Sequence, residues 1–522
     1  MVKQKFFEVC RGSAVVSLIL GFLAVLLGIA VVLIQPHKLY RHAKLTFTED
    51  GESFLLWLKP NIDPIMKLYA YNITNKDAFL AGKEKLRVEQ VGPYIYKEIS
   101  DYLDPKFNHT EGTVTITPTD RMEWIPHLNT RSEDDIFFTP NVVMLLFANQ
   151  FAGKLWPISF LANKTLQETN SSAILKQSLK QILYGTNDNP ILKMGHALAS
   201  FWIKFDKMGL FDRVCDLAGE TETVYTGEKD FKLAGRLAMY NNLTYLPKWD
   251  SPCNNLTGSS DGKKFGNDLA PGETLYFYRR IMCRTLPLVP SGPKIISDQG
   301  IPTVPYKFRN DTMDSRALNL RVKNDCYCTN DTCLPKGLLD TSKCYYGFST
   351  AMSFPHFFEG DPKLSKNIEG LSPNEKLHSS YMYINPDAGI ITNCSMKLQF
   401  NIVMKNVSEM TGVRQFSNLV IPITWADVGF SGLESETAFK IFMALRVFPV
   451  VEKVFIVIML LVGSVLIYLN VGVLQSGHRK ATTQAIQIVK TRIIKDERPI
   501  SGDVLAASDN LLKKENGQIH NT

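Results

Sequence analysis

Residues 14–34 read AVVSLILGFLAVLLGIAVVLI, a run without a charged side chain near the start of a 522-residue chain. A helix rises about 1.5 Å per residue, so this run is long enough to cross the roughly 30 Å of hydrocarbon in a bilayer. Residues 454–474, VFIVIMLLVGSVLIYLNVGVL, have the same character. Helices rich in Leu, Ile, Val and Phe insert favourably into membranes. The sequence therefore predicts a two-pass membrane protein.

The first run could instead be a cleaved signal peptide, whose apolar region is usually about 7 to 15 residues long. Residues 14–34 exceed that length, and no small-x-small cleavage site precedes Pro36. We therefore expect a retained anchor after a short N-terminal segment, residues 1–13. Basic residues flank the anchor on both sides, so positive charge does not fix its orientation.

Glycosylation triplets indicate the orientation. Residues 35–453 contain ten of them, against roughly four expected by chance, and neither residues 1–13 nor residues 475–522 contain any. We therefore expect residues 35–453 to be extracellular or lumenal and both termini to be cytosolic. The predicted acceptors are Asn72, Asn108, Asn163, Asn170, Asn242, Asn255, Asn310, Asn330, Asn393 and Asn406.

Residues 326–344, CYCTNDTCLPKGLLDTSKC, hold four cysteines. Such a density fits a zinc knuckle in a reducing compartment or disulfides in an oxidising one. Because the triplets place this run outside the cytosol, we expect disulfides. Eight of the nine cysteines lie within residues 35–453, an even number that suits pairing. Cys10, beside the first membrane run, is a candidate for S-palmitoylation, with an unmodified thiol as the equal alternative.

The segment between the two runs reads as strands on both sides of a helical region. Residues 39–139 and 224–425 consist of short alternating or β-branched runs broken by turns. Residues 141–151, NVVMLLFANQF, and residues 171–184, SSAILKQSLKQILY, predict helices, the second with apolar residues at i, i+4 and i+7. No linker separates these parts, so we expect one α+β domain with an antiparallel sheet.

Signatures of enzymes are missing from the sequence. G-x-S-x-G, H-E-x-x-H and the P-loop pattern do not occur, and the nine histidines show no metal-binding spacing. We therefore expect no enzyme, cofactor, metal site or nucleic-acid partner, with an unrecognised ectoenzyme as the alternative. Lysines outnumber acids in the helical region, which fits a landing surface for anionic ligands or an ordinary solvated face.

Several stretches together resemble one family. Residues 57–74 (WLKPNIDPIMKLYAYNIT) and 90–96 (QVGPYIY), the cysteine run, and residues 353–362 (SFPHFFEGDP) and 368–390 resemble class B scavenger receptors. That family includes platelet fatty-acid translocase, the lysosomal integral membrane protein and sensory neuron membrane proteins. The resemblance implies a large antiparallel β-barrel ectodomain with a helical apex, residues 141–211 here, and a hydrophobic tunnel leading toward the membrane. Members bind lipoproteins, fatty acids and other lipidic or anionic ligands.

The resemblance also implies roles for single residues. Lys164, in the stretch FLANKTL, is similar in position to a lysine that gates ligand entry, and Lys176 and Lys180 are weaker candidates for the same ligand-binding role. The implied disulfides are Cys253–Cys326, Cys283–Cys344 and Cys328–Cys333. Cys215 and Cys394 depart from the family pattern and would form a fourth bridge or remain thiols.

The function that the resemblance implies is a scavenger-type receptor that helps lipid uptake at the plasma membrane. Endosomes or lysosomes are the alternative location, since the cytosolic tail lacks a complete sorting signal. The alternative function is a two-pass ligand-gated channel or a sensory co-receptor for hydrophobic ligands. Ser13, Ser17 and Gly21 recur every four residues in the first run, a face that would pack on the second run or on another copy in a homo-oligomer.

Overall fold

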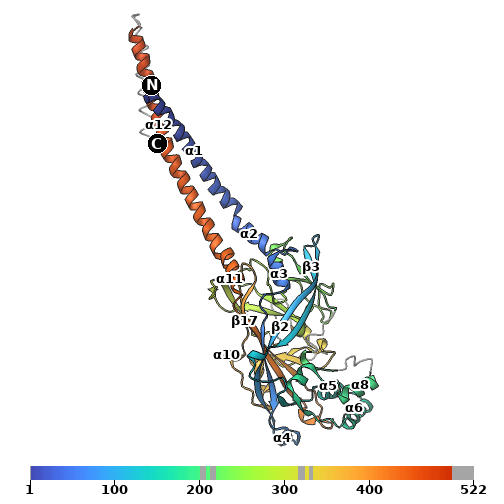
Figure 1. The fold of residues 1–522 in the computed structure, drawn as a ribbon. Coiled ribbons are helices and arrows are strands. Elements are labelled where there is room, and N and C mark those ends of the chain that lie inside the picture. The colour runs from blue at the N-terminus through green and yellow to red at the C-terminus, as the bar shows by residue number, and fades with distance from the viewer. Residues whose placement is uncertain (1, 200–206, 212–218, 316–323, 329–332, 496–522) are drawn as a thin grey trace. The chain divides into compact units, whose positions relative to one another are not determined.

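The computed structural model describes residues 2–199, 207–211, 219–315, 324–328 and 333–495 (Figure 1). The chain divides into two units, one formed by residues 1–37 with 449–522 and the other by residues 38–448. The predicted glycosylation site Asn330 and the extra cysteine Cys215 lie outside the described residues.

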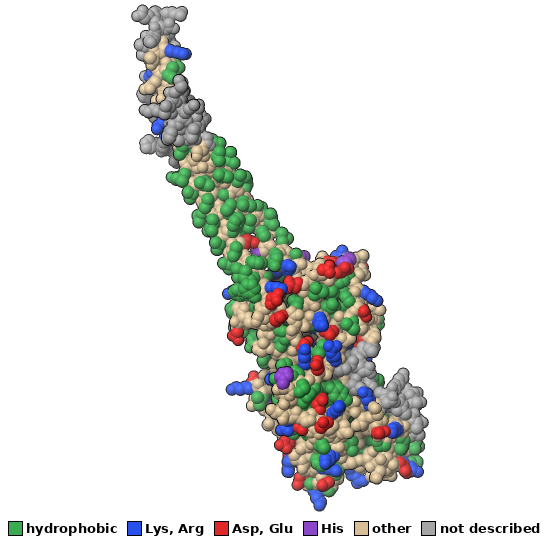
Figure 2. Space-filling view, viewed as in Figure 1, with side chains coloured by type: hydrophobic (Ala, Val, Ile, Leu, Met, Phe, Trp, Pro, Cys, Tyr) green, Lys and Arg blue, Asp and Glu red, His purple; other side chains and the backbone are tan. Residues whose placement is uncertain are grey.

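The first unit consists of the two apolar helices. Helix α1 spans Val2–Ile34 and α12 spans Phe448–Lys495, and Figure 2 shows a continuous band of apolar side chains along part of them. Both are long and apolar enough to cross a membrane, which fits the predicted two-pass topology. A Cβ added at Gly21 would lie 3.0 Å from the carbonyl oxygen of Gly463, so α1 packs closely on the second helix at this glycine, whereas Ser13 of the predicted face is exposed.

The second unit is built on a 15-stranded sheet in which neighbouring strands are almost all antiparallel. Its main order is β7-β6-β3-β2-β1-β17-β16-β15-β11-β9-β8. The strands are β1 Ile65–Ile73, β2 Leu86–Asn108, β3 Thr113–Trp124, β6 Glu222–Tyr225, β7 Leu237–Tyr240, β8 Leu275–Arg279, β9 Arg284–Pro290, β10 Ile295–Ile296, β11 Pro302–Phe308, β12 Leu339–Asp340, β13 Thr350–Ser353, β14 Ile368–Glu369, β15 Tyr381–Ile384, β16 Ile391–Val403 and β17 Val420–Ser431, with β4 Ile136–Pro140 and β5 Ile174–Ser178 forming a separate pair.

The sheet corrects the prediction of a β-barrel. Strands β7 and β8 lie at the two ends of the strand order, and no ladder among the described residues joins them. The chain between them is rich in turns and contributes only isolated bridges, such as Arg236 with Ser260 and Ser260 with Phe277. A barrel requires a continuous ladder around the whole circumference. The sheet is therefore not closed by strand pairing.

Helices gather at two ends of this unit. Figure 1 shows α5, α6 and α8 together at one end and α2, α3 and α11 at the other. The helices are α2 Pro36–Leu45, α3 Glu52–Leu58, α4 Lys76–Leu80, α5 Val142–Phe151, α6 Trp156–Glu168, α7 Leu179–Tyr184, α8 Pro190–Ala199, α10 Glu375–His378 and α11 Ser435–Phe442. The predicted helix over residues 141–151 is confirmed: the Asn141 side chain accepts a hydrogen bond from the Met144 N–H at 3.1 Å and caps it.

The predicted helix over residues 171–184 is wrong in its first half. Residues Ile174–Ser178 form β5, which pairs with β4. The helix begins only at Leu179, because Ser178 and Gln181 form a capping box. The Gln181 N–H donates to the Ser178 hydroxyl at 3.2 Å, and the Ser178 N–H donates to the Gln181 side chain at 2.9 Å. Apolar spacing alone did not locate this boundary.

Three disulfides tie the cysteine run into the fold. They join Cys253 to Cys326, Cys283 to Cys344 and Cys328 to Cys333, the same pairs that the resemblance implied. The four cysteines of the run are therefore oxidised, and the zinc alternative is wrong. Cys394 is a buried free thiol on β16. Cys10 lies within α1.

Candidate functional site

A cavity of about 690 Å³ lies within the second unit. Side chains alternate across a strand, and pairs such as Met66 and Leu68 of β1 and Met396 and Leu398 of β16 face this space from the same side of the sheet. Cavities of a few hundred cubic ångströms with apolar walls are the usual binding sites for small ligands. The apolar lining includes Met66, Leu68, Met122, Phe277, Met352, Met382, Ile391, Met396, Leu398, Val428 and Phe430.

One end of the cavity is formed by the segments that connect to the apolar helices. Leu45 of α2, Leu56 of α3 and Ile441 of α11 line it there. Lys440 also lines this end, and its ammonium group lies 2.6 Å from a carboxylate oxygen of Glu52. In sequence, α2 directly follows α1, and α11 lies a few residues before α12. This end of the cavity is therefore lined by the residues closest along the chain to the candidate membrane spans.

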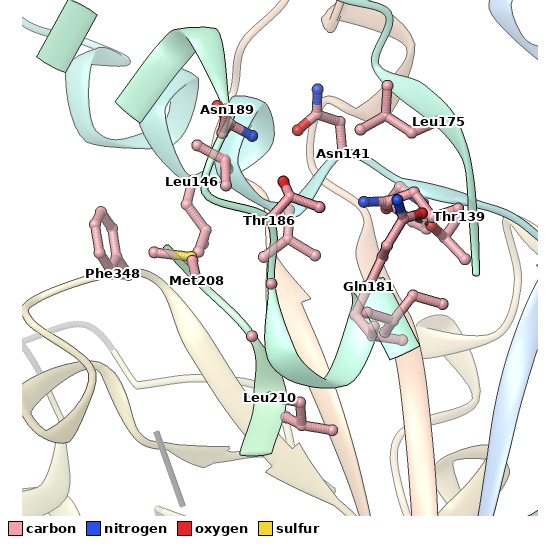
Figure 3. A pocket seen from close by; sticks show the side chains of 18 of the residues that line it. Thr139, Asn141, Leu146, Leu175, Gln181, Thr186, Asn189, Met208, Leu210 and Phe348 are labelled. Carbon is pink, nitrogen blue, oxygen red and sulfur yellow. Dashed lines mark hydrogen bonds between the residues drawn. The ribbon is translucent and has the colours of Figure 1, made fainter. Parts of the chain in front are cut away.

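A second, smaller cavity of about 80 Å³ lies among the helices α5 and α7 and strand β5. In Figure 3, Leu146, Met208 and Phe348 lie on one side of it and Gln181 and Thr139 on the other. Leu210 and Phe400 line both this cavity and the large one. The two cavities therefore have these two residues as a common wall.

The three predicted ligand lysines lie outside both cavities. Lys164 is on α6, Lys176 on β5 and Lys180 on α7, and all three side chains are exposed. The three lysines are therefore on separate elements, and none lines either space.

An apolar surface that was not predicted from the sequence lies beside Lys164. Helix α6 exposes several large apolar side chains, and Trp156 is 74% exposed. The ring of Trp156 stacks on that of Phe160, with 5.4 Å between their centroids. Trp156, Phe160 and Lys164 are spaced four residues apart and share one helical face. This four-residue spacing can be seen in the sequence, but three residues are too few to indicate a periodic helical pattern.

Charged side chains, which were not predicted from the sequence, also line the large cavity. Lys263 and Lys264 come from a loop, and burial lowers the pKa of Lys263 to about 8 and that of Lys264 to about 7. The Lys264 ammonium donates to the Asn267 side chain at 2.6 Å, and that of Lys263 donates to the Ser100 carbonyl at 2.8 Å. Burial also raises the pKa of the Cys394 thiol, which faces the same space, to about 11.

Comparison with known proteins places the chain in a family. The CD36 family model matches residues 16–474. Scavenger receptor class B member 1 of Sus scrofa is 25% identical over 463 residues, 87% of this chain and 89% of its own. Lysosome membrane protein 2 of Homo sapiens is 24% identical over 437 residues, 81% and 87% of the two chains. Protein peste of Drosophila melanogaster is 24% identical over 393 residues, 74% and 69%. These matches confirm the resemblance seen in the sequence, and the chain belongs to the CD36 family.

Proposed function

We propose that this chain is a scavenger-type receptor that binds lipids or lipoproteins and helps lipid uptake through its ectodomain. The observation that carries the proposal is the large cavity with its apolar lining. Removing a lipid chain from water is worth about 0.8 kcal/mol per CH2, so such a space would hold a fatty chain strongly. The methionines in the lining adapt to ligands of different shape. This function requires binding and passage and no catalytic step.

The adjoining cavities support a path for lipid. A ligand captured by the helices of residues 141–211 would enter beside Leu210 and Phe400, which line both spaces. It would leave near α2 and α11, the elements closest along the chain to the candidate membrane spans. Lys164, with Lys176 and Lys180 as secondary candidates, would attract the anionic groups of ligands at the surface, as exposed cations do.

The orientation that goes with this function places residues 35–453 outside the cytosol. Three disulfides support it, because they persist in oxidising compartments. The nine described acceptor asparagines support it too, since none of them is buried. We propose glycosylation at the ten triplets, palmitoylation at Cys10 and residence at the plasma membrane, with endosomes or lysosomes as the alternative.

A channel receives no support from the second span. Its most polar side chain is that of Asn470, whose amide donates to the Leu466 carbonyl of its own helix at 2.8 Å. That group is satisfied without water, whereas a pore lining presents polar groups to a hydrated path.

The test is to fill the cavity and count the bound lipid. Ala426 of β17 lines the cavity, and Ala426→Phe would extend a ring into it. We expect the full-length variant to purify with less lipid per protein molecule than the wild type, measured by mass spectrometry of the extracted lipids. Ala81→Phe, at an exposed position after α4, is the matched control and should leave the lipid content unchanged. An unchanged lipid content in a folded Ala426→Phe protein would contradict the proposal.

A further inference from the structure

A short strand beside the main sheet exposes two consecutive isoleucines. Strand β10 pairs with β11, where Ile295 lies opposite Thr303 and Ile296 lies opposite Pro302. Ile295 is 40% exposed and Ile296 is 51% exposed. Successive side chains of a strand point to opposite faces, so no described part of the chain fully covers either face of β10. A surface strand usually buries one face, so this hairpin indicates a surface that another partner covers.

The turn of the hairpin is fixed to the segment that begins α11. The side-chain amide of Gln299 donates to the Leu433 carbonyl at 2.6 Å, and its oxygen accepts from the Leu433 N–H at 2.8 Å. Gly300 packs on the ring of Phe442 in α11, since a Cβ added at this glycine would lie 2.9 Å from that ring. The hairpin is therefore held in place against α11.

Ion pairs connect the start of the hairpin to α2. One carboxylate oxygen of Asp387 lies 3.7 Å from Nζ of Lys294, directly before β10. The other carboxylate oxygen lies 3.7 Å from Nη1 of Arg41 on α2. Arg41 also pairs with Asp268 at 2.8 Å, which fixes its guanidinium group. Asp387 therefore links β10 to α2.

The connections of α2 and α11 place this end of the sheet unit near a bilayer. Helix α2 directly follows α1, and α11 lies a few residues before α12. A chain that crosses a membrane twice through α1 and α12 leaves and re-enters the bilayer on the same side. Both α2 and α11 then lie close to that surface. The β10 hairpin is tied to both of them, although it is far from either span in the sequence.

Other exposed apolar side chains lie on the same two helices. On α2, Leu39 is 58% exposed and Tyr40 is 42% exposed, and on α11 Phe439 is 62% exposed. Phe439 lies one helical turn before Phe442, so it shares the helical face that meets Gly300. Single exposed apolar residues are ordinary, whereas a group of them at one end marks a contact surface. Tyrosine is also enriched where a protein meets the head groups of a bilayer.

The charges beside the isoleucines favour lipid over a second protein strand. Lys294 precedes the pair and Asp298 follows it, and both are exposed. Charged side chains and a very short length are the features that discourage an edge strand from pairing with another chain. The same charges do not prevent contact with lipid head groups. They limit the contact to a shallow one, at the boundary between head groups and acyl chains.

We propose that the β10 hairpin is a third contact of this protein with the bilayer, in which Ile295 and Ile296 enter the head-group region of the non-cytosolic leaflet. This inference rests on the two-pass topology proposed above. It adds that the sheet unit is held at the lipid surface by the hairpin as well as by its two covalent connections. The partner is a neutral lipid surface, since the apolar side chains supply the contact.

Quenching of tryptophan fluorescence by brominated lipid tests the contact, using full-length protein in phosphatidylcholine nanodiscs. Ile296→Trp is compared in discs with and without bromine near the head-group end of the acyl chains, and the wild-type signal is subtracted. Surface-bound apolar side chains reach about 5–10 Å into this region, so the added fluorescence should fall at least roughly twofold with bromine.

Two further variants are the controls for this measurement. Ile158→Trp is the matched control, because Ile158 is 45% exposed and lies on α6, at the other end of the sheet unit. We expect its fluorescence to be unchanged by bromine. Val457→Trp, near the start of the predicted span in α12, reports the membrane topology and should be quenched. The native sequence has no tryptophan in residues 14–34 or 454–474.

A second measurement needs no variant. Hydroxyl radicals oxidise side chains that water reaches, and the oxidised peptides are identified by mass spectrometry. In nanodiscs we expect Ile295 and Ile296 of the wild type to be oxidised several-fold more slowly than Ile158, whose exposed fraction is similar. Equal oxidation of the three isoleucines would overturn the inference even if a tryptophan variant failed to fold.

The outcomes separate the hairpin contact from the topology. If Val457→Trp is not quenched, the two-pass topology fails and the inference fails with it. If Val457→Trp is quenched and Ile296→Trp is not, the topology stands and the hairpin contact is wrong. Slow oxidation of Ile296 without quenching of Ile296→Trp would assign the hairpin to a protein partner. Equal quenching of Ile158→Trp and Ile296→Trp would show that the contact is not specific to this end.

Discussion

At the scale of single residues, the strongest unexpected feature is a buried pair of stacked histidines. The rings of His356 and His378 lie with centroids 4.5 Å apart, and both side chains are almost fully buried. Nδ1 of His356 accepts the Ser372 N–H at 3.1 Å, and Nδ1 of His378 accepts the Asn374 N–H at 2.9 Å. Both nitrogens must be unprotonated to accept, so the folded protein holds these rings neutral.

This pair predicts acid sensitivity. Burial lowers the pKa of each histidine to about 4. The neighbouring His378 lowers the pKa of His356 further, and Lys397 lowers that of His378 further. The unfolded chain titrates near 6.5, so the stabilisation is complete above that pH and is lost as the pH falls toward 4. The loss is on the order of 3 kcal/mol for each ring. The other titratable group against the pair is the Tyr71 hydroxyl, whose pKa burial raises.

His378→Asn should reduce that sensitivity, because the asparagine oxygen replaces Nδ1 as acceptor but does not titrate. We expect the drop in melting temperature between pH 7 and pH 4.5 to be smaller in this variant than in the wild type. His127→Asn, at an exposed position, is the control and should behave as the wild type. Equal drops in all three proteins would show that the pair does not govern acid stability.

The sequence could not have revealed this pair. The two histidines are 22 positions apart and follow no motif, and only the packing of η6 Pro355–Phe357 against α10 brings them together. The same holds for the ion pair of Glu98 on β2 with Arg279 on β8, which are 181 positions apart in the sequence. By contrast, the three disulfide pairs were implied correctly by the family resemblance, which gives the partner of each matched cysteine even where the two are 73 and 61 positions apart.

At the scale of elements, periodicity predicted the types of structure better than their limits. Apolar runs located α1, α12 and α5, and alternation located most strands, but the prediction of strands from residue 39 onward is wrong for α2 and α3. The apolar residues before Ser178 have helical spacing, but Ile174–Ser178 pair with β4 as a strand. The capping box at Ser178 sets the start of the helix. Closure of the sheet could not be predicted either, since alternation indicates that a residue lies in a strand but not which strand lies beside it.

Ser178→Ala should loosen helix α7 by removing one half of the capping box. Loss of such a cap costs about 1 kcal/mol, so the amides of the first turn of α7 should exchange with deuterium roughly fivefold faster. Hydrogen exchange followed by mass spectrometry measures this directly. Ser171→Ala, in the loop before β5, is the control. If the variant and the control exchange alike over residues 179–184, the capping box does not set the start of the helix.

At the scale of the whole molecule, the two units support different parts of the proposed function. The two apolar helices fit a two-pass membrane topology, and the sheet unit encloses the space that would take up lipid. Family membership supports the receptor role, at about 25% identity to relatives such as Scavenger receptor class B member 1. Because the chemistry of the cavity is largely apolar, its specificity would depend on a few charged groups in the wall.

Photolabelling tests the central claim most directly. Palmitate carrying a diazirine on its chain would be added to the full-length protein in membranes, and the sample would be irradiated. The labelled peptides would then be mapped by mass spectrometry. The account predicts adducts on the cavity strands β16 and β17, at residues such as Met396 and Phe430, that disappear when unlabelled palmitate competes. Competable adducts confined to the exposed face of α6, with none on the cavity strands, would contradict it.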